Sequence, residues 1–315
     1  MSTGIVLMTY GAPRDDADLP RYLAAVRGGR TPAEDLVDEM RRRYALISGS
    51  PLVRLTRAQA AALEAELGDG HLVRAGMRYS EPWVADAARA LVADGATRLV
   101  GVVMSPQWSD LLMRGYADAL AEAARELGVD ATTARSWHTE PAFIDAIAKR
   151  VIEARVDAPE AAVVMTAHSL PRRVFESEAA YVAQLRETAE LIAARVGLAA
   201  AEWRWAYQSA GHTQEEWLRP DLKELFPEIA AGGSREVLIV PVQFLADHLE
   251  VLYDLDIAAA DEARACGLRY RRIAMPNTQR AFIRALADVV RKTLARTPPD
   301  AGHARPADPR APARA

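Results

Sequence analysis

The chain has 315 residues, half of them hydrophobic and 26% charged, which excludes a wholly disordered protein and suffices for more than one hydrophobic core. Its net charge of −4 argues against a general nucleic-acid binder, and its single cysteine, Cys266, excludes an intramolecular disulfide, a multi-cysteine zinc site and a cysteine-held iron–sulfur cluster. No apolar run is long enough to cross a bilayer, and the N-terminus lacks the pattern of a secretory signal. We therefore expect a cytoplasmic protein without integral membrane contact.

Short β-rich apolar runs alternate with longer amphipathic stretches along the chain. The predicted strands are residues 5–9, 72–78, 99–104, 162–167, 203–207, 237–242 and 268–273. The predicted helices are residues 52–67, 82–93, 111–127, 142–154, 177–196 and 278–295. Continuous apolar strands separated by helices are typical of a parallel sheet covered on both faces. The pattern predicts an α/β fold with two doubly wound, Rossmann-like domains, each a parallel sheet flanked by helices.

The predicted domains are residues 1–147 and 148–296, with the option that the final helix, 278–296, packs back on the first domain. Residues 297–315 are rich in proline and alanine and are expected to form a disordered tail. Right-handed crossovers would place the functional loops at the carboxyl ends of the strands.

Tyr10 follows the first predicted strand and precedes a Gly-x-Pro turn. In this position its side chain can point into a crevice between the domains. The alternative is a partly buried tyrosine that only ties down the turn. The usual dinucleotide, P-loop and nucleophile-elbow motifs are absent from the sequence, so the strand ends are the main candidates for chemistry.

His168 stands at the carboxyl end of the predicted strand 162–167, before Pro171. A neutral imidazole there can ligate a transition metal or accept a proton near neutral pH. The alternative is a histidine satisfied by local hydrogen bonds.

An acidic series follows the predicted strand 237–242. Asp247 is expected to cap a helix, and Glu250 and Asp254 then share one helix face with it. Stacked carboxylates repel one another unless they face solvent, a cation or protons in transit. The alternative is a capped helix with a solvated acidic face.

Arginines near the start of the chain could bind carboxylates. Arg27 and Arg30 flank two glycines in a flexible loop, and Arg43 follows. The turn around Ser50 contains Gly49 and would let a flat ligand approach the backbone. In a chain with so many arginines, the alternative is that any of them is a surface residue.

Together these segments resemble the ferrochelatase family, which inserts iron into porphyrins. The matching blocks occur in the family's order from about residue 4 to residue 295. They are Tyr-Ala-Leu-Ile-Ser-Gly-Ser-Pro-Leu at 44–52, Met-Arg-Tyr-Ser-Glu-Pro-Trp at 77–83, Ala-His-Ser-Leu-Pro at 167–171, Ala-Tyr-Gln-Ser at 206–209, Trp-Leu-Arg-Pro at 217–220, Asp-His-Leu-Glu-Val-Leu-Tyr-Asp at 247–254 and Met-Pro-Asn at 275–277. The resemblance implies two chelatase-type domains, with His168 and Glu250 in the positions of the catalytic histidine and glutamate.

One branch of the family carries Tyr-Gly-x-Pro in its first block, as residues 10–13 do here. That branch converts coproporphyrin III to coproheme in haem biosynthesis. The resemblance implies that Tyr10 is the axial oxygen ligand of the iron porphyrin product. It also implies that Arg27, Arg30, Arg43 and Ser50 approach the porphyrin and its propionates.

The sequence departs from the family in its acidic row. Relatives carry acids spaced by four residues, whereas here the row reads Glu250, Asp254 and Ala258, so the outermost acid is missing. The segment before Ser50 is one residue shorter than in some relatives. Some relatives hold a [2Fe–2S] cluster on several cysteines, which this chain lacks.

The resemblance implies Fe²⁺ as substrate, no tightly bound cofactor and a transient haem-pathway partner that receives coproheme. His168 and Glu250, expected to oppose each other across the cleft, would take the pyrrole protons or deliver the metal, and the sequence leaves their division of labour open. Asp254 would pass protons towards solvent, and Tyr10 would hold the iron from the other face. The alternatives are a protoporphyrin IX ferrochelatase and a non-catalytic porphyrin- or haem-binding protein.

Overall fold

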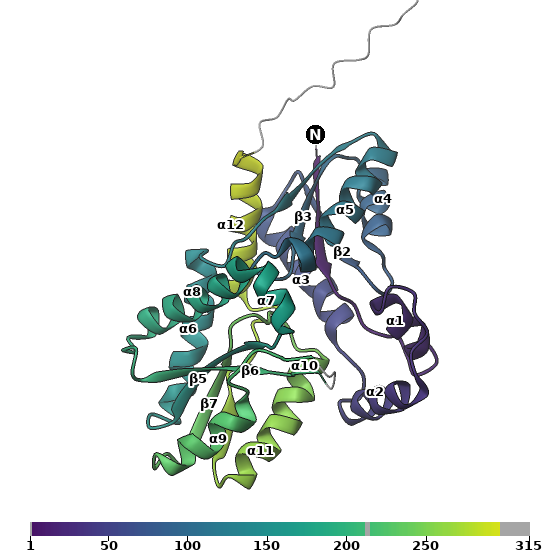
Figure 1. Cartoon of the computed structure of the whole chain (residues 1–315). Helices are drawn as coiled ribbons and strands as arrows, with labels where there is room; N and C mark the ends of the chain where they lie inside the picture. The colour runs from purple at the N-terminus through teal and green to yellow at the C-terminus, as the bar shows by residue number, and fades with distance from the viewer. Residues whose placement is uncertain (1, 212–214, 297–315) are drawn as a thin grey trace, which may run out of the picture.

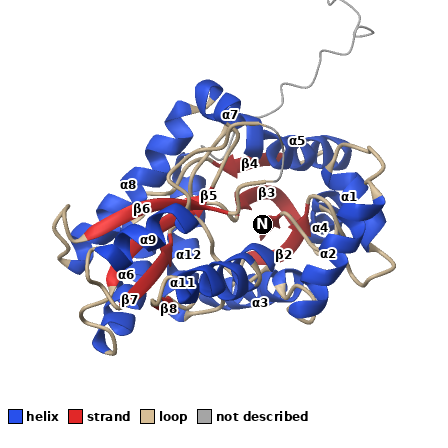
Figure 2. Cartoon of the chain, turned by 60° about the horizontal axis from the view of Figure 1, so that its bottom comes forward, coloured by secondary structure: helices blue, strands red, loops and turns tan. Residues whose placement is uncertain are grey.

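Two parallel four-stranded sheets form the framework of the protein (Figures 1 and 2). The computed structural model describes residues 2–211 and 215–296, and the predicted tail, 297–315, lies outside them. The first sheet has the order β2-β1-β3-β4 and the second has the order β6-β5-β7-β8. In both sheets the first strand of the chain segment lies between the second and the third, so the two sheets share one topology. Every strand pair in both sheets is parallel. The predicted α/β class with two doubly wound sheets is confirmed.

The central strands are buried on both faces because helices cover both sides of each sheet. Ile5, Val6, Leu7 and Met8 are fully buried in β1, although their side chains alternate between the two faces. The strand bounds are β1 Ser2–Thr9, β2 His71–Met77, β3 Ala96–Val103, β4 Asp130–Ala134, β5 Ala162–His168, β6 Trp203–Gln208, β7 Glu236–Pro241 and β8 Arg269–Arg272.

Strand β4 was not predicted. Its sequence, Asp-Ala-Thr-Thr-Ala, has no apolar run, and only Ala134 is buried. It lies at the edge of the first sheet, where pairing with β3 rather than burial of large side chains holds it. Composition alone therefore gave no signal for this strand.

The helices surround the sheets, and each predicted amphipathic stretch corresponds to a helix to within a few residues. Their bounds are α1 Leu19–Val26, α2 Glu34–Leu46, α3 Leu52–Leu67, α4 Val84–Ala93, α5 Asp110–Leu127, α6 Pro141–Val156, α7 Arg172–Ser177, α8 Ala179–Val196, α9 Leu222–Ala231, α10 Leu249–Leu252, the π-helix η1 Asp254–Ala259, α11 Ala260–Ala265 and α12 Arg280–Arg296. Helices α1, α2, α7, α9 and α11 were not predicted. Helix α2 buries only Val37, so it lacks the apolar stripe that makes α3 recognisable.

The predicted helix cap at Asp247 is wrong. Helix α10 begins after His248 and lasts one turn, and a π-helix then starts at Asp254. Asp247 instead accepts a hydrogen bond from Asn277 Nδ2 at 2.7 Å, because residue 277 lies beside the loop that follows β7. The acidic residues therefore do not share one regular helix face.

Helix α12 joins the two halves of the molecule (Figure 1). It packs on α3, β3 and β4 of the first half and on α6, and one cluster of buried residues runs through both halves. The predicted domain boundary at residue 147 falls inside α6, and the division into two domains stays a prediction. Among residues 2–211 and 215–296, no helix combines the length and the apolar character needed to cross a membrane.

Candidate active site

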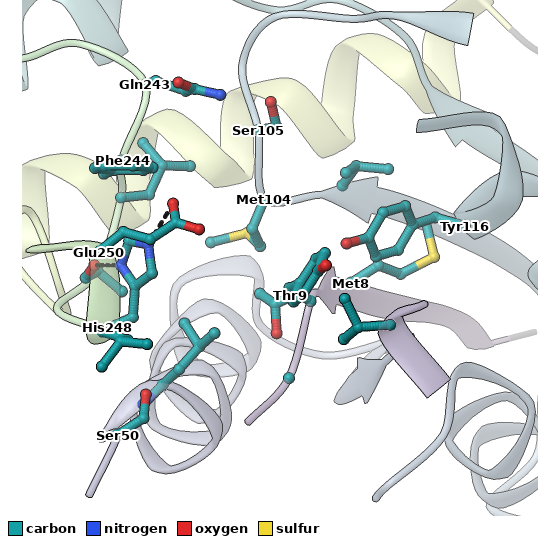
Figure 3. Close-up of a pocket in the computed structure, with 18 of the residues that line it drawn as sticks. Met8, Thr9, Ser50, Met104, Ser105, Tyr116, Gln243, Phe244, His248 and Glu250 are labelled. Carbon is teal, nitrogen blue, oxygen red and sulfur yellow. Dashed lines mark hydrogen bonds and ion pairs between the residues drawn. The ribbon is translucent and has the colours of Figure 1, made fainter. Parts of the chain in front are cut away.

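A cavity of about 330 Å³ opens where the carboxyl ends of central strands from both sheets face each other. Its walls come from the segments after β1, β3 and β7 and from helices α1 and α2. The lining residues are Met8, Thr9, Tyr10, Gly11, Tyr22, Leu23, Val26, Met40, Tyr44, Ser50, Leu52, Gln59, Val103, Met104, Ser105, Met113, Tyr116, Gln243, Phe244, Leu245, Ala246, His248, Leu249 and Glu250. Figure 3 shows His248 and Glu250 on one side of the cavity and Met8, Thr9 and Tyr116 on the other.

Tyr10 lies in the cavity wall directly after β1, and the residue as a whole is 44% exposed. Its ring packs against Tyr79 with centroids 4.6 Å apart. The chain turns at Gly11, which has φ of 98° and no room for a Cβ because Ser80 Oγ occupies that space. Burial raises the pKa of Tyr10 above the ordinary range, and the neighbouring Tyr79 and Glu250 add to this effect.

His168 is the last residue of β5 and is oriented by two hydrogen bonds. Its backbone N–H donates to Gln243 Oε1 at 3.0 Å, and its Nδ1 lies 2.5 Å from the carbonyl oxygen of Ser169. Because a carbonyl only accepts, Nδ1 carries a proton. Nε2 then holds the lone pair when the ring is neutral and a second proton when the ring is charged. Nε2 faces the Glu250 carboxylate, 3.8 Å from Oε1.

A second histidine, His248, contacts the same carboxylate. Its Nδ1 lies 2.9 Å from the carbonyl oxygen of Ala246, and its Nε2 lies 3.6 Å from Glu250 Oε2. The sequence analysis did not single out His248, although it stands two residues before Glu250 in a strand-end segment. That spacing was the available signal.

Glu250 therefore lies between two imidazoles. Burial raises its pKa, but His168 and His248 outweigh burial and lower the pKa to about 2. Burial also lowers the pKa of His248, and the pairing with Glu250 outweighs it, so the net shift is upward. The arrangement keeps an ionised carboxylate next to imidazoles that can carry or accept protons.

Asp254 lies one turn farther along, at the start of the π-helix. Burial raises its pKa, the Glu250 charge raises it further, and the Arg43 guanidinium, with Nη1 3.6 Å from Asp254 Oδ1, acts in the opposite direction. Two neighbouring carboxyl groups thus have pKa values shifted apart, which suits one to remain ionised while the other accepts a proton.

The expectation that His168 and Glu250 oppose each other across the cleft is wrong. Both come from the second sheet and lie side by side, because β5 and β7 are neighbouring strands. Tyr10 comes from the first sheet. The cavity thus separates the tyrosine from the histidine and glutamate.

The remaining predicted residues lie at different distances from the cavity. Ser50 lines it, and Arg43 contacts Asp254 beside it. Arg27 and Arg30 are exposed and do not line the cavity. Within the described parts of the chain, no group of three or more histidine, cysteine, aspartate or glutamate side chains is arranged to hold a metal ion.

Comparison with known proteins identifies the family of the chain. A sequence model of the ferrochelatase family matches residues 2–294. Ferrochelatase from Deinococcus radiodurans is 38% identical over 304 residues, covering 93% of this chain and 96% of that protein. Coproporphyrin III ferrochelatase from Bacillus subtilis (strain 168) is 37% identical over 306 residues, covering 93% and 98%.

Solved structures share the fold at lower sequence identity. SirB from Bacillus subtilis with Fe³⁺ superposes with a TM-score of 0.59 at 14% identity, covering 94% of this chain and 96% of that one. CbiX, the terminal enzyme for biosynthesis of sirohaem in denitrifying bacteria, gives a TM-score of 0.55 at 14% identity, covering 93% and 99%. The predicted chelatase-type fold is confirmed. The family match over residues 2–294 and the relatives from Deinococcus radiodurans and Bacillus subtilis at 37–38% identity show that the chain belongs to the ferrochelatase family, lyases that insert iron into a porphyrin.

Proposed function

We propose that this enzyme inserts Fe²⁺ into coproporphyrin III, giving coproheme and releasing two protons. The observation that carries the choice of substrate branch is Tyr10, which lines the cavity in the Tyr-Gly-x-Pro context. Several relatives at similar identity, including those from Geobacillus sp. (strain WCH70) and Bacillus subtilis, are coproporphyrin III ferrochelatases.

In the proposed complex the macrocycle lies between the two sheets with its propionates at the rim. Arg43 and Ser50 would hold carboxylates near helix α2, whereas Arg27 and Arg30 would reach the substrate from their exposed loop. Carboxylate contacts remote from the ring nitrogens can supply the binding energy that bends the macrocycle. A bent ring presents its pyrrole nitrogens to one side.

In the proposed reaction the pair His168 and Glu250 serves both the protons and the metal. Pyrrole protons pass to the His168 Nε2 lone pair or to the Glu250 carboxylate, and the same atoms replace water around Fe²⁺ as it enters. Asp254, whose pKa is raised mainly by burial, takes protons onward towards solvent. Tyr10 ligates the inserted iron through its phenolate oxygen from the first sheet.

The deciding experiment is anaerobic metallation of coproporphyrin III and protoporphyrin IX side by side with Fe²⁺. We expect a higher kcat/KM for coproporphyrin III, because two more propionates offer two more partners for arginine. An equal or higher kcat/KM for protoporphyrin IX would identify a protoporphyrin ferrochelatase. Binding without metallation of either porphyrin would identify a non-catalytic binding protein. The cytoplasmic location and the partner that receives coproheme stay predictions.

A further inference from the structure

Helix α2 of the first half is held to the start of the π-helix of the second half by two arginines. Arg42 Nη2 donates a hydrogen bond of 2.7 Å to the Tyr253 hydroxyl. The guanidinium carbons of Arg42 and Arg43 lie 5.6 and 4.9 Å from the centroid of the Tyr253 ring. Tyr253 is the residue between α10 and η1. The two arginines therefore contact the chain between Glu250 and Asp254.

Glu39 binds both guanidinium groups. Its carboxylate accepts hydrogen bonds from Arg42 at 2.9 and 3.0 Å and from Arg43 Nε at 2.7 Å. The hydrogen bonds from Arg42 and Arg43 lower the pKa of Glu39 to about 2. The hydrogen bond to Glu39 and the contact with the Tyr253 ring together hold the Arg43 guanidinium in one orientation.

The contact between Arg43 and Asp254 is of a different kind. Their closest nitrogen and oxygen atoms are 3.6 Å apart, which is an ion pair without a hydrogen bond. A carboxylate that makes short, bidentate hydrogen bonds to the guanidinium binds it more strongly than this. The pair is also largely withdrawn from water, with side chains 20% and 15% exposed, so solvent screens it only partly.

Arg43 does not itself line the cavity but stands between residues that do. Met40 and Tyr44, three residues before it and one after it, both line the cavity wall. On the other side, Glu250 lines the cavity and Asp254 follows it by one turn. For a ligand in the cavity to reach Arg43, its carboxylate must be carried on a flexible arm that extends past these lining residues.

We propose that Arg43 is shared between Asp254 and a substrate carboxylate, so that porphyrin binding withdraws the counter-ion of Asp254, with Arg42 and Tyr253 as positioning residues. This inference rests on the proposed function, because it takes the ligand to be a porphyrin with propionate arms. Once Arg43 pairs with the propionate, Asp254 loses its arginine partner, and His168 and His248 remain as the basic groups beside Asp254 and Glu250. A cation is then bound there more strongly when the macrocycle is in place than when it is absent.

Sharing makes a distinctive prediction for binding, because the two carboxylates compete for one guanidinium. Replacing Asp254 by Asn should tighten binding of metal-free coproporphyrin III, measured by protein fluorescence quenching, about fivefold, within the range of ordinary site coupling. The tightening should vanish when Asp254→Asn is made in the Arg43→Met background. The double variant completes the double-mutant cycle. Asp256→Asn is the matched control, since Asp256 is on the same π-helix but pairs with Arg272 at 2.7 and 2.8 Å.

The positioning role has its own test. Tyr253→Phe keeps the ring below the guanidinium groups and should leave KM for coproporphyrin III within about twofold, as expected for one partly exposed hydrogen bond. Tyr253→Leu removes the ring as well and should raise KM about fivefold while kcat changes less, with the cation–π contact as the lost interaction. If Tyr253 has only a structural role, both variants should lose thermal stability, and Tyr253→Leu should not raise KM more than it changes kcat.

The outcomes separate this inference from the proposed function. If wild-type protein binds and metallates coproporphyrin III but Asp254→Asn binds it no more tightly, or tightens equally without Arg43, the sharing of Arg43 is wrong and the function stands. If wild-type protein fails to bind coproporphyrin III, the proposed function and the inference are both wrong. Tightening that requires Arg43 supports both.

Discussion

The histidine at the end of β5 has its Nδ1 engaged by a backbone carbonyl and its Nε2 directed at Glu250. We expect His168→Ala to reduce anaerobic Fe²⁺ insertion at least about a hundredfold, the contribution typical of a positioned acid–base group. Porphyrin binding should persist because His168 is not part of the cavity lining. Single-turnover metallation and fluorescence titration measure the two effects separately. Activity within about tenfold of wild type would contradict the assignment.

Glu250 and Asp254 differ in their neighbours and should differ in their variants. Glu250→Gln removes the charge between His168 and His248 and should slow metallation about as much as His168→Ala does. Asp254→Asn should slow it less, because Asp254 lies one turn beyond Glu250. Steady-state kcat for both variants under the same conditions checks the order. A larger loss in Asp254→Asn would reverse the proposed proton route.

The proposed role of Tyr10 as an iron ligand can be tested by spectroscopy. If its phenolate holds the product iron, ferric coproporphyrin bound to the protein shows a high-spin, oxygen-ligated absorption and Raman signature, which Tyr10→Phe abolishes while product loss becomes faster. Metal insertion should survive, because His168 and Glu250, which we propose to serve the protons and the metal, come from the other sheet. A tyrosine that only ties down the turn would instead cost about 1 kcal/mol of stability. An unchanged ferric spectrum in Tyr10→Phe would decide for that reading.

At the scale of elements, helix α5 contains a glycine that leaves room for a charged side chain. A Cβ at Gly115 would overlap the guanidinium of Arg78, which packs over the rings of Tyr79 and Tyr116 with its carbon 5.3 and 5.2 Å from their centroids. Arg78 Nε also donates a hydrogen bond of 2.8 Å to the Tyr79 hydroxyl, so moving the guanidinium aside would cost this bond and the contacts with both rings.

Gly115→Ala should therefore lower the free energy of unfolding by about 1–3 kcal/mol, since overpacking outweighs the better helix propensity of alanine. Urea denaturation measures this. In the Arg78→Met background the same substitution should cost much less, because methionine is shorter than arginine and its flexible side chain can move aside. Equal costs in both backgrounds would show that Arg78 is not the obstacle.

The elements near the site were predictable to different degrees for physical reasons. His168 could be placed at a strand end because a buried apolar run precedes it, and the structure makes it the last residue of β5. The helix start at Asp247 was predicted wrongly because capping preferences are local, whereas Asn277, thirty residues away, binds the Asp247 carboxylate. The side-by-side placement of His168 and Glu250 depends on strand order, which no local pattern records. Their chemical roles remain predictions.

At the scale of the molecule, helix α12 is fastened to α6 by an ion pair that spans 152 residues of sequence. Lys292 Nζ lies 2.8 and 2.7 Å from the two carboxylate oxygens of Glu140, which is 8% exposed. Lys292→Met should lower the free energy of unfolding by about 1–2 kcal/mol, less than for a fully buried pair because the lysine is half exposed.

The double variant Lys292→Met with Glu140→Leu should recover most of that loss, because no buried charge is then left without a partner. Thermal or urea unfolding of the single and double variants checks both statements. A double variant as unstable as the sum of its parts would show that Glu140 stabilises the molecule through other contacts, such as its place at the start of α6.

The separation of Tyr10 from the His168–Glu250 pair by the cavity has a stereochemical consequence. A macrocycle such as coproporphyrin III has two faces that are mirror images of each other, and free metal ions in solution attack both alike. In this protein the first sheet would address one face and the second sheet the other. Under the proposed function, metallation is therefore a reaction with facial selectivity: the ion approaches one prochiral face and the oxygen ligand meets it at the opposite one.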